Sequence, residues 1–151
     1  MAAFVDTSGV VKLYVAETGS RWMSQVIRPR GITISAVTVT EVGSTLSRRV
    51  RDGSLTPHQA RLAWALFRRQ SRGFVTMPLS PDSLRAAARL TARSVEPLRA
   101  LDAIQLQGAI EAVRDARRNG LAAPTFISAD ERLLRAAAAV GLSIDDPRRH
   151  T

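Results

Sequence analysis

The sequence predicts an α/β domain with a mostly parallel central sheet. Short apolar stretches alternate along the chain with longer stretches of helical periodicity, and most of the helical stretches end at a glycine. This alternation is typical of parallel strands that are connected by helices. A chain of 151 residues is long enough for one domain with a hydrophobic core and too short for two comfortable ones.

The strand candidates are short stretches rich in valine, isoleucine, phenylalanine and threonine. These residues favour strands because they pack well on a pleated surface. In a parallel sheet the carboxyl ends of the strands face one edge, and binding sites form in the crevice outside that edge. Residues that follow the strands are therefore the first candidates for a site. The expected strands cover residues 2–5, 32–35, 74–78, 124–128 and 142–144.

Helices are expected between and after the strands. Most are followed by a glycine that can form the C-cap, and the second stops before Pro29. Two begin with a proline after a hydroxyl residue, which is a good combination of N-cap and first helical position. The expected helices cover residues 8–17, 20–28, 38–51, 57–72, 81–94, 101–119 and 130–140.

The charge balance and the cysteine count limit the possible functions. The net charge is +9, from 22 basic and 13 acidic residues, and Lys12 is the only lysine. Arginine binds phosphate with two parallel hydrogen bonds, so this excess suits a nucleic-acid partner, although a general compositional bias toward arginine explains it equally well. The absence of cysteine excludes disulfides, thiolate catalysis and cysteine-ligated metal sites.

Histidine chemistry and membrane insertion are also disfavoured. The two histidines, His58 and His150, lie far apart in sequence, so neither a histidine metal site nor a Ser-His-Asp triad is expected. No apolar stretch is long enough to span a membrane, and the N-terminus lacks the features of a signal peptide. We therefore expect a cytoplasmic protein without membrane contact. Residues 1–147 are expected to form the single domain, and residues 148–151 a mobile tail.

Asp6 and Glu41 each follow an expected strand, and each has a structural as well as a functional explanation. Asp6 comes directly after residues 2–5, where an aspartate can serve as N-cap of the next helix. Glu41 lies one turn into the helix after residues 32–35, where Thr38 and Glu41 have the spacing of a capping box. Taken singly, both acids are explained by helix capping.

Asp102 and Asp130 are the other two candidates. Asp102 opens a long helix, where the helix dipole stabilises a negative charge by about 0.3–1 kcal/mol. Its apolar neighbours suggest that it is partly buried and needs a cation as partner. Asp130 ends the stretch TFISAD, and Ser128 with Glu131 can form a capping box without it. Asp130 therefore has no necessary capping role and favours a functional interpretation.

Taken together, the four acids favour a metal site. Three of them follow strand ends, and the fourth opens a helix after a loop. Four carboxylates at one edge of a sheet repel one another strongly unless a divalent cation lies among them. Mg²⁺ and Mn²⁺ prefer carboxylate and water ligands and need neither histidine nor cysteine. The set predicts an acidic pocket for Mg²⁺ or Mn²⁺.

Four short motifs resemble the PIN-domain nucleases, and above all the VapC-type toxins of VapBC toxin–antitoxin pairs. The motifs stand in the order found in that family and are separated by helices. The resemblance covers nearly the whole chain, from residue 4 to the closing stretch that ends at residue 147. The motifs are FVDTS at 4–8, TVTEV at 38–42, LDAIQL at 101–106 and FISAD at 126–130, the last followed by Arg132-Leu133-Leu134.

The resemblance implies a three-layer α/β/α sandwich and an endoribonuclease that cleaves cellular RNA, often tRNA or ribosomal RNA, and so arrests growth. It implies metal-assisted hydrolysis of the phosphodiester, in which Asp6, Asp102 and Asp130 are ligands of Mg²⁺ or Mn²⁺. Glu41 would be a further ligand or an outer-shell residue. A cognate antitoxin protein and a homodimer are also expected from the resemblance.

Several other residues are candidates for supporting roles. Thr7 and Ser128 can hydrogen-bond a metal ligand or a metal-bound water. Arg99, three residues before Asp102, either contacts an RNA phosphate or lies in solvent.

The arginine clusters and the apolar helix surfaces suggest partners. The arginines within 48–51 and 68–72 either line an RNA groove or offset the dipoles of the helices that they end. If the chain is a VapC-like toxin, an antitoxin segment would dock on the apolar surface of residues 37–50 and 62–67.

Two other classes of function fit parts of the sequence. Haloacid-dehalogenase and receiver-type phosphoryl-transfer domains also have an aspartate after the first strand. The former needs a second aspartate where Ser8 stands, and the latter needs a lysine after a late strand, which this chain lacks. A non-catalytic RNA-binding module that uses its arginines alone stays open, and it predicts that nothing depends on the acids.

Overall fold

The computed structural model describes residues 2–27 and 31–150. Five parallel strands form one sheet, as the sequence predicts, and their order is β3-β2-β1-β4-β5. β1 is the central strand, so Asp6, which follows it, lies at the middle of the carboxyl edge. The strands are β1 (Ala3–Val5), β2 (Ile32–Ser35), β3 (Val75–Met77), β4 (Thr125–Ile127) and β5 (Ile144–Asp145).

The helices lie where the sequence predicts them, with small shifts at their ends. The expected end of the second helix, at Arg28 and Pro29, lies outside the described residues. Among the residues that the structure describes, no helix has the length and apolarity to cross a membrane. The helices are α1 (Thr7–Val11), α2 (Ser20–Ile27), α3 (Val37–Arg51), α4 (Pro57–Gln70), α5 (Pro81–Arg93), α6 (Ala100–Arg118) and α7 (Glu131–Ala139), with short 3₁₀ turns η1 (Ser71–Gly73) and η2 (Pro147–Arg149).

α1 is shorter than predicted, because it ends at Val11 and not at residue 17. Side chains bond the backbone of the loop that follows. Ser20 Oγ donates to Val15 O (3.0 Å) and accepts from Glu17 N (3.0 Å). Such local side-chain bonds compete with helical hydrogen bonds and stop the helix.

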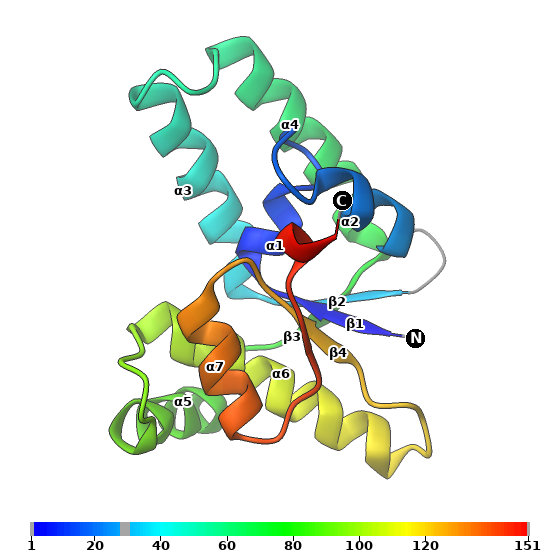
Figure 1. Ribbon diagram of the computed structural model, residues 1–151, viewed down its shortest axis with the longest axis vertical. Coiled ribbons are helices and arrows are strands. Elements are labelled where there is room, and N and C mark those ends of the chain that lie inside the picture. Colours follow the sequence, from blue (N-terminus) through cyan, green and yellow to red (C-terminus); the bar gives the residue numbers. More distant parts are fainter. Residues whose placement is uncertain (1, 28–30, 151) are drawn as a thin grey trace.

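The helices cover both faces of the sheet, which confirms the three-layer α/β/α arrangement (Figure 1). α1 to α4 pack on one face and α5 to α7 on the other. Alternate residues of β1 reach the two cores. Ala3 and Val5 pack with the first group of helices, whereas Phe4 packs with the second group and stacks on Phe126, with ring centroids 5.9 Å apart. Burial on both faces explains why the strands are continuously apolar.

β1 and β4 form the part of the edge on which the acids converge. Asp6 N donates to Ile127 O (2.9 Å), so the two strands stay paired up to their last residues. α1 then passes tightly over this edge. Gly9 is required there because a Cβ would lie 2.8 Å from Val5 Cγ1. The residues that follow β1 and β4 are thereby held side by side.

The end of the described chain contacts the domain beyond the boundary expected at residue 147. Asp146 is buried and accepts hydrogen bonds from Arg148, and η2 spans the expected boundary. The His150 ring stacks on Trp22 at a centroid distance of 4.1 Å. The predicted tail therefore contacts the domain as far as His150. Thr151 lies outside the described residues.

Candidate active site

The four acids selected from the sequence line one pocket of about 260 Å³ at the carboxyl edge of the sheet. Thr7 and Ser8 of α1 line the same pocket. The acids come from four elements: the end of β1 (Asp6), the second turn of α3 (Glu41), the first turn of α6 (Asp102) and the N-cap of α7 (Asp130). The structure therefore brings together residues that are far apart in sequence.

Asp6 has both of the roles that its position allows. It caps α1 by accepting from Ser8 N (3.2 Å), and its side chain is buried in the pocket wall at 6% exposure. Ser8 Oγ and Ser128 Oγ donate to the same oxygen, Oδ2, at 2.6 and 3.0 Å. Burial raises the pKa of Asp6 because it disfavours the charged form, and the bonds from Ser8 and Ser128 offset only part of this effect.

Glu41 does not form the capping box predicted with Thr38, so that part of the prediction is wrong. α3 begins one residue earlier than expected, at Val37, and its N-cap makes no side-chain bond. The Glu41 carboxylate instead accepts from Thr7 Oγ1 (2.7 Å) and from Gln105 Nε2, both at Oε2. Burial raises its pKa, with the charges of Asp6 and Asp102 adding to the rise and the bonds from Thr7 and Gln105 opposing it.

Asp102 and Asp130 are both half-buried and both bonded by backbone at a helix start. Asp102 Oδ2 accepts from Arg99 N at 3.1 Å, in the first turn of α6. Asp130 is the N-cap of α7, where its Oδ1 accepts from the backbone N–H groups of Arg132 (2.9 Å) and Leu133 (3.2 Å). The prediction that Asp130 has no capping role is therefore wrong.

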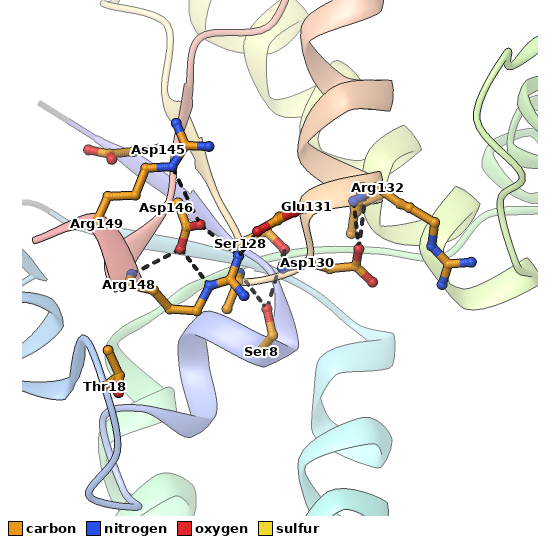
Figure 2. A network of polar contacts seen from close by, with 12 residues as sticks. Ser8, Thr18, Ser128, Asp130, Glu131, Arg132, Asp145, Asp146, Arg148 and Arg149 are labelled. Carbon is orange, nitrogen blue, oxygen red and sulfur yellow. Dashed lines mark hydrogen bonds and ion pairs between the residues drawn. The ribbon is translucent and has the colours of Figure 1, made fainter.

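Ser128 does not form the capping box expected with Glu131. Its hydroxyl donates to Asp6 and accepts from Asp130 N at 3.0 Å, so it joins two of the acids. Figure 2 shows Ser128 beside Asp130 and Ser8. Ser8 adds a second connection, because its hydroxyl accepts from Ala129 N at 2.8 Å. The start of α1 and the loop after β4 are locked together at this point.

Glu41, Asp102 and Asp130 are each held through one oxygen among the described residues. The hydrogen bonds to Glu41 fall on Oε2, those to Asp102 on Oδ2 and those to Asp130 on Oδ1. Asp6 accepts at Oδ2 from Ser8 and Ser128 and is also bonded by the backbone of Thr7. The second oxygens of the other three acids have no protein donor in the described part of the chain. Carboxylates bonded in this way are fixed in orientation and still offer one lone-pair oxygen to a ligand.

This donor set fits a hard divalent cation. It consists of carboxylate oxygens with nearby hydroxyls, which are the ligands that Mg²⁺ and Mn²⁺ prefer. Burial raises the pKa of Glu41, and repulsion from Asp6 and Asp102 adds to the rise; a bound cation relieves this repulsion. In the described part of the chain, however, no group of three or more acidic or histidine side chains is close enough to count as a preformed metal cage. Water would complete the coordination of a cation held here.

A family model of the PIN domain matches residues 3–139, a range that runs from β1 through α7 and includes all four acids. The chain belongs to the PIN domain family. The family predicted from the four motifs is thereby confirmed. A comparison with curated proteins finds no match to this PIN domain.

Several solved structures share the fold of this PIN domain. A toxin–antitoxin complex from Klebsiella pneumoniae matches with a TM-score of 0.62 and 18% identity, over 97% of this chain and 98% of that one. A protein from Pyrobaculum aerophilum matches with a TM-score of 0.64 and 19% identity, over 99% and 91%. VapC20 of Mycobacterium tuberculosis, a sarcin-ricin loop cleaving toxin, matches with a TM-score of 0.63 and 18% identity, over 93% and 96%. At these identities the similarity shows the fold alone.

Two residues of the PIN domain site were not selected from the sequence. Gln105 lies one turn after Asp102 on α6 and is 1% exposed, and its amide reaches Glu41 and Thr7. The available signal was a polar residue on the apolar face of a helix. Ser8 bonds Asp6 and Ala129, and in the sequence it was only one hydroxyl beside Thr7. Thr7 and Ser128, which were selected, both bond an acid of the pocket.

The PIN domain pocket also has a basic side. Arg48 and Arg49 of α3 line it, together with Glu17. Glu17 Oε1 pairs with the buried Lys12 Nζ at 2.8 Å, and Glu17 Oε2 pairs with Arg49. Burial alone would raise the pKa of Glu17, but these two cations lower it. Arg99 is exposed and is not among the residues that line the pocket.

Proposed function

We propose that this PIN domain is a divalent-metal-dependent endoribonuclease. The observation that carries the proposal is the acidic pocket, where four carboxylates converge and three of them are bonded through one oxygen, with the other oxygen free of protein donors among the described residues. Asp6, Asp102 and Asp130 would bind Mg²⁺ or Mn²⁺ directly. Glu41 would be a ligand or would hold a metal-bound water. An arginine-rich chain with a net charge of +9 suits RNA as the substrate.

The residues of the pocket would act mainly by positioning. When bound, the cation lowers the pKa of a water and neutralises charge that develops on the phosphoryl oxygens. Ser8 and Ser128 fix the orientation of Asp6, and Thr7 and Gln105 fix that of Glu41. The raised pKa values of Asp6 and Glu41 mean that protonation competes with metal binding more strongly as the pH falls.

We further propose that the protein is the toxin of a toxin–antitoxin pair. The fold is shared with VapC20 and with the Klebsiella pneumoniae complex. A groove of about 460 Å³ between α3 and α4 has a largely apolar lining that includes Leu46, Val50 and Trp64. It lies where the sequence predicts antitoxin docking. Transfer RNA or ribosomal RNA would be the target, and the toxin would act as a homodimer.

The direct test is cleavage of a mixed tRNA and ribosomal RNA pool by purified, antitoxin-free protein in Mg²⁺ or Mn²⁺. Asp102→Asn removes one pocket acid. Asp115→Asn is the matched control, because Asp115 is an exposed acid on the same helix and, among the described residues, its side chain pairs with Arg118 alone, at 4.0 Å. We expect discrete fragments from the wild type and from Asp115→Asn, and none from Asp102→Asn or in EDTA.

A metal-binding measurement separates this proposal from a non-catalytic RNA-binding module. A cation that binds only the folded protein stabilises it by about 2.7 kcal/mol at a hundredfold excess over its Kd. Mn²⁺ should therefore raise the melting temperature of the wild type and of Asp115→Asn but not of Asp102→Asn. RNA binding without cleavage, and with equal melting shifts in all three proteins, would support the RNA-binding module instead.

A further inference from the structure

One face of α3 forms a continuous wall of the acidic pocket. Glu41, Thr45, Arg48 and Arg49 all line the pocket, and their spacing places them on the same side of the helix. The rise of an α-helix puts the Cα atoms of Glu41 and Arg48 about 10 Å apart along the axis. The wall therefore begins with a carboxylate at the candidate metal site and ends with guanidinium groups.

The two arginines differ in the partners they already have. Arg49 is half-buried and pairs with Glu17, which is held in turn by the buried Lys12. Arg48 is exposed, and among the described residues its guanidinium forms no hydrogen bond or ion pair. Its charge helps to lower the pKa of Asp52, but that carboxylate is held mainly by Ser54. Arg48 thus has five N–H donors to offer at the edge of the pocket.

We infer that Arg48 binds a backbone phosphate of single-stranded RNA that flanks the scissile phosphate. Guanidinium is the side-chain group best matched to phosphate, which it can bind through two parallel hydrogen bonds. A pocket lined by acids repels a polyanion, so a cation on its rim stabilises the strand where it leaves the acids. Arg48 lies about 10 Å from Glu41 along the helix axis, so we assign it to a neighbouring phosphate and not to the scissile phosphate beside the acids. This inference rests on the proposed ribonuclease function.

Arg51 provides a matched control. It is an exposed arginine in the last turn of the same helix, and it is not among the residues that line the pocket. Arg48→Gln and Arg51→Gln therefore remove the same charge from the same segment, and only the first removes a pocket cation. Both residues are exposed, so neither substitution disturbs the core.

The first measurement is kcat/KM on a short RNA that the wild type cleaves at one bond, at several salt concentrations. We expect Arg48→Gln to lower kcat/KM by about fivefold to tenfold, chiefly through KM. Loss of one phosphate contact on a single strand should also reduce the slope of log kcat/KM against log salt by about 0.7. Arg51→Gln should stay within about twofold of the wild type with an unchanged slope.

The second measurement replaces one phosphate at a time with an uncharged methylphosphonate. One flanking replacement should slow the wild type and Arg51→Gln but have no further effect on Arg48→Gln, because the partner is already missing. Two results would overturn the phosphate subsite. One is an equal loss of kcat/KM in Arg48→Gln and Arg51→Gln, and the other is a methylphosphonate effect that adds to that of Arg48→Gln at every position. In that case, cleavage by the wild type would leave the proposed function intact. If the wild type cleaves no RNA at all, the proposed function itself fails.

Discussion

Gln105 Nε2 donates a hydrogen bond to Glu41 Oε2, although the two residues are 64 positions apart. The same nitrogen lies 2.9 Å from Thr7 Oγ1 and 3.0 Å from Thr38 Oγ1. The opposite orientation of the amide would set its oxygen against the carboxylate, so the orientation is determined by the neighbours. A fully buried side chain of α6 thereby fixes the direction in which the acid of α3 points.

Gln105→Met should weaken the site without weakening the fold. Methionine has nearly the same shape but no donor, and loss of such an outer-shell partner typically costs 10–100-fold in metal affinity or activity. The melting temperature of the metal-free protein should change little, because the lost bonds to Glu41 and Thr38 are offset by the removal of Gln105 Oε1, a buried oxygen without a partner among the described residues. Calorimetric titration with Mn²⁺ and a melting curve in EDTA provide the two readouts.

The control for this substitution is Gln107→Met. Gln107 is also a buried glutamine of α6, but it bonds Glu111 at 2.8 Å and does not line the acidic pocket. We expect the Mn²⁺ affinity of the Gln107→Met variant to match that of the wild type. Equal losses of affinity in the two variants would show that Gln105 has no specific role at Glu41.

Asp6→Asn should stabilise the metal-free protein at neutral pH. Burial raises the pKa of Asp6, so the folded state binds a proton more tightly than the unfolded state, and the wild type loses stability as the pH rises from about 4 through the folded pKa. Asparagine carries no charge and can still cap α1. In EDTA, the variant should melt a few degrees higher at pH 7.5, since about 1 kcal/mol shifts the melting temperature of such a domain by roughly 2–4 °C.

The difference between wild type and Asp6→Asn should disappear below about pH 3, where Asp6 is protonated in both states. Melting curves between about pH 3 and pH 8 test this dependence. A variant that is less stable than the wild type at every pH would show that the hydrogen bonds from Ser8 and Ser128 outweigh the cost of burying the charge.

Tyr14→Phe should leave the stability unchanged or increase it. Tyr14 packs edge-to-face on Phe67, and its hydroxyl is buried without a partner among the described residues. Burial raises its pKa to about 12. A buried hydroxyl without a hydrogen bond costs about 1–3 kcal/mol, and phenylalanine keeps the ring contact. Urea unfolding of the two proteins measures the change; a loss of more than about 1 kcal/mol would mean that the hydroxyl has a partner after all.

Arg148→Ala should destabilise the end of the chain. Arg148 binds the buried Asp146 through Nε (3.1 Å) and Nη2 (2.8 Å) and reaches Glu131, next to Asp130 (Figure 2). Loss of both guanidinium bonds to the buried Asp146 should cost about 1–2 kcal/mol at pH 7. Arg148 lowers the pKa of Asp146, so this stabilisation exists above the unfolded pKa and is lost as the pH falls through the folded one.

Arg149→Ala is the control for the C-terminal segment. The Arg149 side chain is 77% exposed and lies 3.8 Å from the Asp146 carboxylate. Its removal should therefore lower the free energy of unfolding by less than about 0.5 kcal/mol. Chemical unfolding at pH 7 and below pH 4 compares the two variants. A cost for Arg148→Ala that persists in acid would mean that packing, and not the ion pair, holds the segment.

Local patterns in the sequence predicted the elements well and the hydrogen bonds of the site less well. The spacing of Thr38 and Glu41 and that of Ser128 and Glu131 both fit capping boxes, and neither box forms. In both cases the side chain bonds a partner from another element instead. Glu41 accepts hydrogen bonds from Thr7 and Gln105, and the Ser128 hydroxyl donates to Asp6. Capping rules consider only neighbours in sequence, so they miss such competition.

The sequence by itself determined the parallel sheet, the helices that cover it and the four acids at its edge, because periodicity, capping residues and strand ends are local properties. Only the tertiary structure decided which donors hold each acid, that Gln105 orients Glu41, and that Arg48 lines the acidic pocket while Arg51 does not. These features depend on distances between side chains from different elements. Such distances are fixed by packing of the two cores and cannot be derived from spacing along the chain.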